Sequence, residues 1–257
     1  MKNLSKFIFV IMLIIPFIVS AEELEEEVVA QSIKYIKTVT VYNNSDVMRN
    51  AGFGEITSLT TEVTKEEFDN APSTTSDVDE LSPRGSIQTE TTYKRLTTTV
   101  TKVATYYQYA VNLYWKNIPK VRSNDIIGIG YYNDVELLSS PNIIFNQDYC
   151  RSANNCYISV SGTEVVQEYG TAVIFKVPAD NLISLEQTLS FYVKKAVSWT
   201  ITEQVAAGDY AHATSSITQS KAASNLIINS LGLAPQHEIE DYYDTTPSAR
   251  AHWIGTW

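Results

Sequence analysis

The chain has 257 residues, of which 44% are hydrophobic, and it carries 29 acidic against 19 basic residues, a formal net charge of −10. Because an acidic excess repels nucleic acids and anionic membrane surfaces, this balance argues against nucleic-acid binding. The length suffices for one large domain or two small ones.

The first 21 residues have the three parts of a secretory signal peptide. Lys2 and Lys6 give a positive start, an apolar run of 13 residues extends from Phe7 to Val19, and small residues lead to Ala21. The alternative is a membrane anchor, but a spanning helix needs about 20 apolar residues. We therefore expect cleavage after Ala21 and a secreted, extracellular protein with no membrane span in its mature form.

Residues 22–88 predict an acidic arm ahead of the main domain, since residues 22–90 hold 15 acidic and 5 basic residues. Within the arm, Ile33–Tyr42 and Ile56–Val63 have strand composition and could pair as a β-hairpin. Thr64–Glu67 fits a capping box that opens a short helix. Pro72–Arg84 has the composition of a linker. We expect the folded core to begin at residue 89 and not to need this arm.

Residues 89–257 predict an antiparallel β-sandwich, so the fold class is all-β. The clearest strand is Tyr107–Trp115, in which large apolar residues alternate with smaller or polar ones, as expected when one face of a strand packs on a core. Lys221–Gly232 favours a helix, and the apolar end of the chain favours a docked strand, so a short C-terminal helix or strand extension is expected. Further strands are expected at Ile126–Tyr132, Tyr157–Ser161, Thr171–Val177, Thr188–Val193, Val197–Thr202 and Thr214–Thr218.

Cys150 and Cys156 are the only cysteines, and five residues separate them. An exported protein lies in a compartment where disulfides persist. The alternatives are a metal pair or a free thiol, but a two-cysteine metal site needs His or carboxylate partners at short spacing, which this segment lacks. We therefore expect a disulfide between them.

Signatures of catalysis are missing from the sequence. It has neither a Gly-x-Ser-x-Gly elbow nor a phosphate-binding glycine loop, and Gly128-Ile-Gly130 indicates close backbone packing inside a strand. His212 is interpreted as a hydrogen-bonded structural residue. His237–Asp244 is interpreted as a solvated acidic face, with a metal site as the alternative. We assign no catalytic residue, no metal and no cofactor.

Tyrosine is abundant, with 16 residues. If the odd positions of Tyr107–Trp115 face the core, then Tyr106, Gln108, Asn112 and Tyr114 stand on the opposite face. Aromatic rings beside amides suit sugar or peptide binding. The plainer interpretation is that tyrosine is a good strand former. We predict these four residues as a binding face.

The segments Leu113–Ile129 and Gly208–Ile217 resemble uncharacterised secreted proteins of Gram-positive bacteria. The shared pattern is a Trp-Lys strand, a proline, an Arg-Ser-x-Asp turn and an apolar glycine strand, with a later Tyr-x-His-Ala segment. The resemblance spans about residues 89–220 and ends there, because a glycine-rich strand pair does not follow. It implies an exported all-β protein and brings no activity with it.

The favoured function is non-catalytic recognition of a cell-envelope carbohydrate or protein. One alternative is a pore-forming or membrane-active toxin, because the polar, threonine-rich Thr97–Ala104 alternates weakly and could form a barrel hairpin. Liposome leakage tests it. A third hypothesis is an extracellular hydrolase assembled from distant residues, which a cleft holding carboxylates with displaced pKa values would support.

Overall fold

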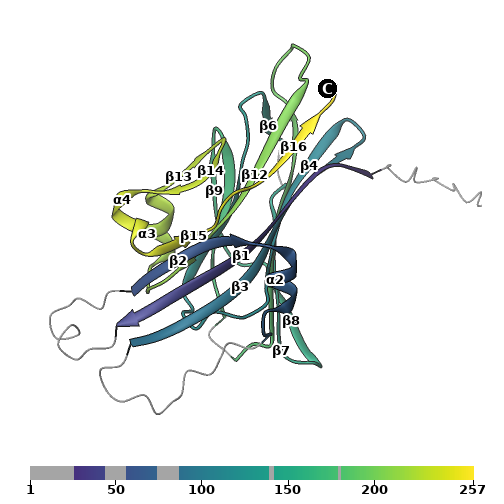
Figure 1. Cartoon of the computed structure of the whole chain (residues 1–257). Coiled ribbons are helices and arrows are strands. Elements are labelled where there is room, and N and C mark those ends of the chain that lie inside the picture. The colour runs from purple at the N-terminus through teal and green to yellow at the C-terminus, as the bar shows by residue number, and fades with distance from the viewer. Residues whose placement is uncertain (1–25, 44–55, 74–86, 139–141, 179–180) are drawn as a thin grey trace, which may run out of the picture.

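Two antiparallel sheets pack together as a β-sandwich (Figure 1). The structure, a computed structural model, describes residues 26–43, 56–73, 87–138, 142–178 and 181–257. The all-β fold class is therefore confirmed.

The larger sheet has the strand order β2-β1-β3-β4-β11-β7-β8, with β6 beside β11. Its strands are β1 (Glu26–Asn43), β2 (Ile56–Val63), β3 (Ile87–Val103), β4 (Tyr106–Trp115), β6 (Val135–Leu137), β7 (Ile144–Ser152), β8 (Asn155–Ser159) and β11 (Ser184–Lys195).

The smaller sheet has the order β15-β12-β5-β10-β9, with β16 also paired to β12. Its strands are β5 (Asn124–Gly130), β9 (Thr163–Gln167), β10 (Gly170–Lys176), β12 (Glu203–Ala213), β15 (Tyr243–Thr245) and β16 (Ala249–Ile254). The hairpin of β13 (Leu226–Asn229) and β14 (Gly232–Pro235) and the helices α3 (Gln219–Ser224) and α4 (His237–Glu240) gather beside this sheet (Figure 1).

The main core lies between the two sheets because each contributes one apolar face to it. On β4 the odd positions 107–115 are buried and the even positions are at least partly exposed, as the alternation in the sequence predicts. Tyr109, Leu113 and Trp115 are at most 1% exposed and pack in one cluster with Ile127 of β5 and Tyr210 of β12.

A second apolar cluster covers the other face of the smaller sheet. Ile126 and Ile174 point away from the main core and pack against Leu226 and Ile228 of β13. The hairpin lies so close to β5 that a Cβ at Gly128 would come 2.5 Å from Leu233 Cδ2. The prediction of close backbone packing at Gly128-Ile-Gly130 is thus confirmed.

The predicted arm contributes strands to the larger sheet. β1 pairs with β2 and, over most of its length, with β3. Ile36 is fully buried in the main core, and Thr64 caps α2 (Lys65–Asn70) by accepting a hydrogen bond from Glu67 N, as the capping box predicts. That residues 89–257 fold independently of residues 22–88 stays a prediction, although strands from both segments pair in the larger sheet.

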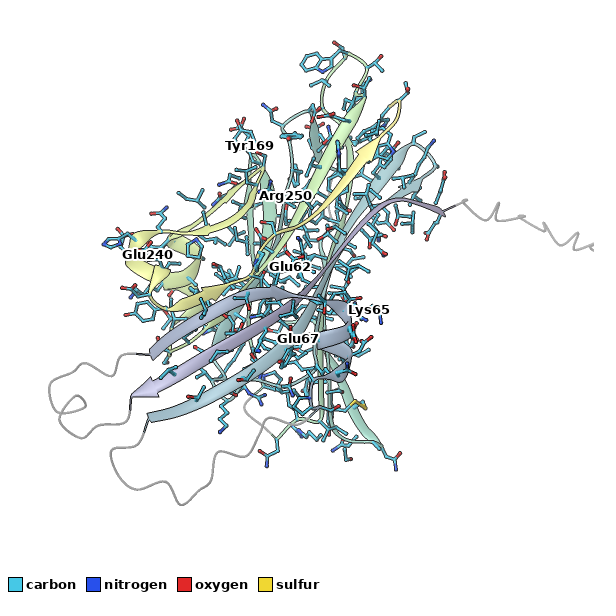
Figure 2. The ribbon with its side chains drawn as sticks, viewed as in Figure 1. Glu62, Lys65, Glu67, Tyr169, Glu240 and Arg250 are labelled. Atoms are coloured by element: carbon cyan, nitrogen blue, oxygen red, sulfur yellow. A yellow bond between two sulfur atoms is a disulfide. The ribbon has the colours of Figure 1, made fainter. Side chains whose placement is uncertain are left out.

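Ion pairs tie β1 to its neighbours at the surface, and Figure 2 labels their acidic partners, Glu62 and Glu67. Lys34 Nζ lies 2.7 Å from Glu62 Oε2 of β2, and Lys37 Nζ lies 3.3 Å from Glu67 Oε1 of α2. Most of the predicted linker, Pro72–Arg84, falls between Ser73 and Ile87, where the residues are not described.

Three sequence predictions of secondary structure are wrong. Val197–Thr202 is irregular, and Thr214–Thr218 follows the end of β12 rather than forming a strand, because Thr218 instead caps α3 by accepting from Lys221 N. The helix expected at Lys221–Gly232 ends at Ser224. Beyond it Leu226 and Ile228 are buried and Ile227 is exposed, a period of two that favours β13.

The threonine-rich stretch Thr97–Ala104 lies mostly within β3, which pairs with β1 on one side and β4 on the other. The hypothesis of a membrane-active hairpin stays a prediction. Among the described residues, no helix is long and apolar enough to cross a membrane.

Candidate binding site on the larger sheet

The four residues of the predicted binding face lie on the side of β4 that points away from the core. Tyr106 is 39% exposed, and Gln108, Asn112 and Tyr114 are partly exposed. Tyr106 and Tyr114 are eight residues apart, or about 26 Å along an extended strand. One small ligand therefore cannot contact both rings.

A hollow of about 450 Å³ lies at the Tyr114 end of this face. We call it the Tyr114 hollow. Its wall includes the rings of Tyr114, Tyr149 and Tyr157, the carboxylates of Asp148 and Glu186, and the Cys150–Cys156 disulfide. Three neighbouring strands supply these groups, because Tyr114 of β4 lies opposite Glu186 of β11, which lies opposite Asp148 of β7.

Stacking and cation–π contacts hold the tyrosine rings of the Tyr114 hollow. Tyr149 and Tyr157 stack with centroids 5.4 Å apart and an interplanar angle of 24°. The guanidinium of Arg151 lies 4.9 Å from the Tyr157 centroid, and that of Arg95 lies 5.3 Å from the Tyr114 centroid. Cation–π contacts of this kind fix an aromatic ring while leaving part of it accessible.

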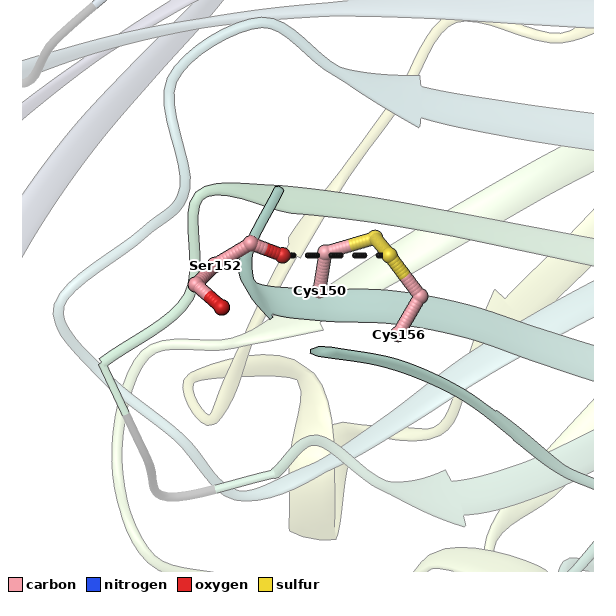
Figure 3. The surroundings of a disulfide bond; sticks show 3 residues. All are labelled: Cys150, Ser152 and Cys156. Atoms are coloured by element: carbon pink, nitrogen blue, oxygen red, sulfur yellow. Dashed lines mark hydrogen bonds between the residues drawn. A yellow bond between two sulfur atoms is a disulfide. The ribbon is translucent and has the colours of Figure 1, made fainter. Parts of the chain in front are cut away.

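The disulfide predicted between Cys150 and Cys156 is confirmed (Figure 3). It joins β7 to β8 at directly opposed positions, with Cα atoms 4.0 Å apart. Tyr149 and Tyr157 each adjoin one of the cysteines, so the bond limits the motion of the hairpin that carries both rings.

The two carboxylates of the hollow differ in their surroundings. Asn112 Nδ2 donates to Glu186 Oε1 at 2.7 Å and to Thr188 Oγ1 at 2.9 Å, so Asn112 holds Glu186 in place. Burial, followed by repulsion from the Glu186 carboxylate, raises the pKa of Asp148 above its ordinary value. The hollow therefore combines two carboxylates with three tyrosine rings.

The structure brings together only part of the predicted face. Tyr114 lines the hollow and Asn112 positions one of its carboxylates, whereas Tyr106 lies toward the far end of β4. Tyr149 and Tyr157, which were not among the predicted site residues, complete the hollow. Their positions next to the two cysteines are the signal that could have identified them.

The surroundings of His212 and His237 can be compared with the roles predicted for them from the sequence. His212 is buried with Nδ1 3.0 Å from Asp125 Oδ2, which agrees with a hydrogen-bonded structural residue. His237 is exposed and lies 2.8 Å from Glu240 Oε1. The solvated face expected at His237–Asp244 is wrong at its end, because Asp244 turns inward from β15 and is only 7% exposed. Within the described ranges, no group of three or more His, Cys, Asp or Glu residues is placed to hold a metal ion.

Comparison with known proteins gives only remote likenesses. No protein family matches the chain, and no curated protein matches it. The collagen binding domain of Erysipelothrix rhusiopathiae surface protein RspB aligns with a TM-score of 0.30 and 8% identity, covering 68% of this chain and 72% of that one. A structure titled BspA_C_WT aligns with a TM-score of 0.31 and 7% identity, covering 85% and 84%. At these scores neither likeness carries an argument about ligand or mechanism.

Proposed function

We propose that the protein is a secreted, non-catalytic recognition module that binds a cell-envelope carbohydrate in the Tyr114 hollow. The main observation that supports this function is that three tyrosine rings and two carboxylates line one hollow. Sugar rings have apolar C–H faces that stack on aromatic planes, and hydroxyl groups around their edges that donate to carboxylates. The disulfide and the stacked pair keep the hollow formed without ligand, which lowers the entropic cost of binding.

The test compares two single tyrosine variants of the same strand. We expect Tyr114→Ala to weaken binding to envelope glycans at least about tenfold, because a central aromatic contact contributes more than 1 kcal/mol. Tyr106→Ala is the matched control, since it removes the same side chain from the same face outside the hollow. A glycan array with the purified mature chain identifies the ligand, and calorimetry measures both variants.

Equal binding by Tyr114→Ala and the parent protein, with both folded, would exclude the hollow. A protein partner gives a different result. In a pull-down from envelope extract with the purified mature chain, capture would then survive glycosidase treatment of the extract and be lost after protease treatment.

A second candidate is a glycoside hydrolase that uses the same hollow. Asp148 and Glu186 occupy opposed positions on the neighbouring strands β7 and β11 and both line the hollow, and the raised pKa of Asp148 suits a general acid. Paired carboxylates of this kind cleave glycosidic bonds in many hydrolases. Release of reducing ends from the bound glycan, lost in both Asp148→Asn and Glu186→Gln, would favour the enzyme over the binding module.

A further inference from the structure

A lysine and an aspartate meet in the buried region between the two sheets. Lys94 of β3 is 0% exposed, and Asp244 of β15 is 7% exposed. Lys94 Nζ lies 3.3 Å from Asp244 Oδ2, although 150 residues separate the two in sequence. The pair therefore joins the larger sheet to the smaller one.

Aromatic rings surround the lysine. Nζ lies 5.0 Å from the ring centroid of Trp115, its neighbour on β4, and 5.8 Å from that of Tyr210 on β12. Both rings belong to fully buried side chains. They shield the Lys94 amine from bulk water, which would otherwise solvate its charge.

Both oxygens of the Asp244 carboxylate receive hydroxyl hydrogen bonds. Thr38 Oγ1 of β1 donates to Oδ2 at 3.1 Å, and Thr60 Oγ1 of β2 donates to Oδ1. Fixed donors of this kind withdraw electron density from the carbonyl carbon and stabilise negative charge on its oxygens during attack by a nucleophile.

We propose that Lys94 and Asp244 become joined by an amide bond between their side chains. An ion pair buried in this way is expensive, because desolvation of both charges offsets their attraction. Conversion to a neutral amide removes both charges. The rigid strands hold the amine against the carboxyl group, which replaces an encounter between free molecules with an intramolecular reaction of very high effective concentration.

The reaction needs no external oxidant, activating group or cofactor. One proton passes from the Lys94 ammonium to the Asp244 carboxylate, leaving a neutral amine and a carboxylic acid. The amine lone pair then attacks Cγ, and an N–C bond forms. A second proton passes from nitrogen to the departing hydroxyl, the C–O bond breaks, and one water molecule leaves. Ammonium and carboxylate thus become amide and water, with atoms and charge balanced.

Peptide mapping of the unreduced secreted protein tests the proposal directly. Trypsin does not cut after an acylated lysine, so we expect residues 85–95 and 222–250 to appear as one cross-linked species. Its mass should be lower than the sum of the two peptides by one water molecule. Lys94→Ala and Asp244→Ala should each lose the cross-linked species, and their peptides report this whether or not the variants are stable.

A surface ion pair provides the control within the same digest. Lys194 Nζ lies 3.0 Å from Glu136 Oε1, but both side chains are about half exposed. We expect normal cleavage after Lys194 and no link to Glu136. Cleavage after Lys94 with a free peptide 222–250 would overturn the proposal. So would a loss of water confined to 222–250, as from cyclisation of Asp244 onto its own backbone, or a link to another residue.

Discussion

Trp115 is among the largest fully buried side chains of the main core. It is 1% exposed and meets Tyr210 and His212 edge-on, with centroids 5.8 and 5.3 Å away, and it covers the Lys94 ammonium. Trp115→Ala should lower the free energy of unfolding by about 3–5 kcal/mol through the cavity it leaves. Tyr106→Ala, on the exposed face of the same strand, should change it by less than about 1 kcal/mol. Chemical denaturation measures both, and similar values for the two would contradict the assignment of inner and outer faces.

We expect Asp209 to make the free energy of unfolding depend on pH. It is 4% exposed on β12, accepts a hydrogen bond from Leu233 N at 2.7 Å, and has its pKa raised to about 7 by burial. A carboxyl group whose pKa is higher in the folded state favours folding when protonated. Its contribution is therefore full below about pH 4 and is lost as the pH rises to about 7.

The loss amounts to at most about 4 kcal/mol, at about 1.4 kcal/mol for each unit of pKa difference. Asp209→Asn should abolish this part of the decline, so that its stability relative to the parent increases between pH 4 and pH 8. Asp241→Asn, at an exposed position, should follow the parent. Urea titrations at a series of pH values provide the test, and parallel curves for Asp209→Asn and the parent would contradict it.

At the scale of elements, β1 decides whether residues 22–88 are dispensable. Its pairing with β3 extends from Glu26 to Asn43, Ile36 is buried in the main core, and Thr38 binds Asp244 of the smaller sheet. The sequence alone predicts a core that folds without this arm. These contacts lead us to expect the reverse, that a chain beginning at residue 87 is unfolded or molten, because it exposes this core surface and an edge of β3. A chain that begins at Glu26 should keep the parent's cooperative unfolding in circular dichroism. If a chain that begins at residue 87 has the same free energy of unfolding as the parent, residues 22–88 are not needed for the core to fold.

The elements differ in how well their sequences predict them. β4 was predictable because one of its faces is buried and the other exposed, which produces a period of two. β12 was missed because the core lies on one side of it and the α3, α4 and β13–β14 layer on the other. Every position from Ala206 to Ala213 is buried, so the sequence shows no alternation there.

At the scale of the whole molecule, several properties follow from the sequence alone. These properties depend only on neighbours in the chain. The alternation in β4 predicted the all-β class, the capping residue Thr64 predicted the start of α2, and the short Cys150–Cys156 spacing predicted the disulfide. The signal peptide stays a prediction of the same kind, because residues 1–25 lie outside the described part of the chain. The resemblance to secreted Gram-positive proteins also stays a prediction.

Only the tertiary structure decided which distant residues meet. Tyr114, Glu186 and Asp148 share a hollow because β4, β11 and β7 are neighbours in the sheet, an order that local sequence does not encode. In the sequence, Lys94 stands in a polar stretch and Asp244 ends an acidic one, so both resemble surface residues. Packing of the two sheets places them 3.3 Å apart in the interior, because the face of a strand that is buried depends on what covers it.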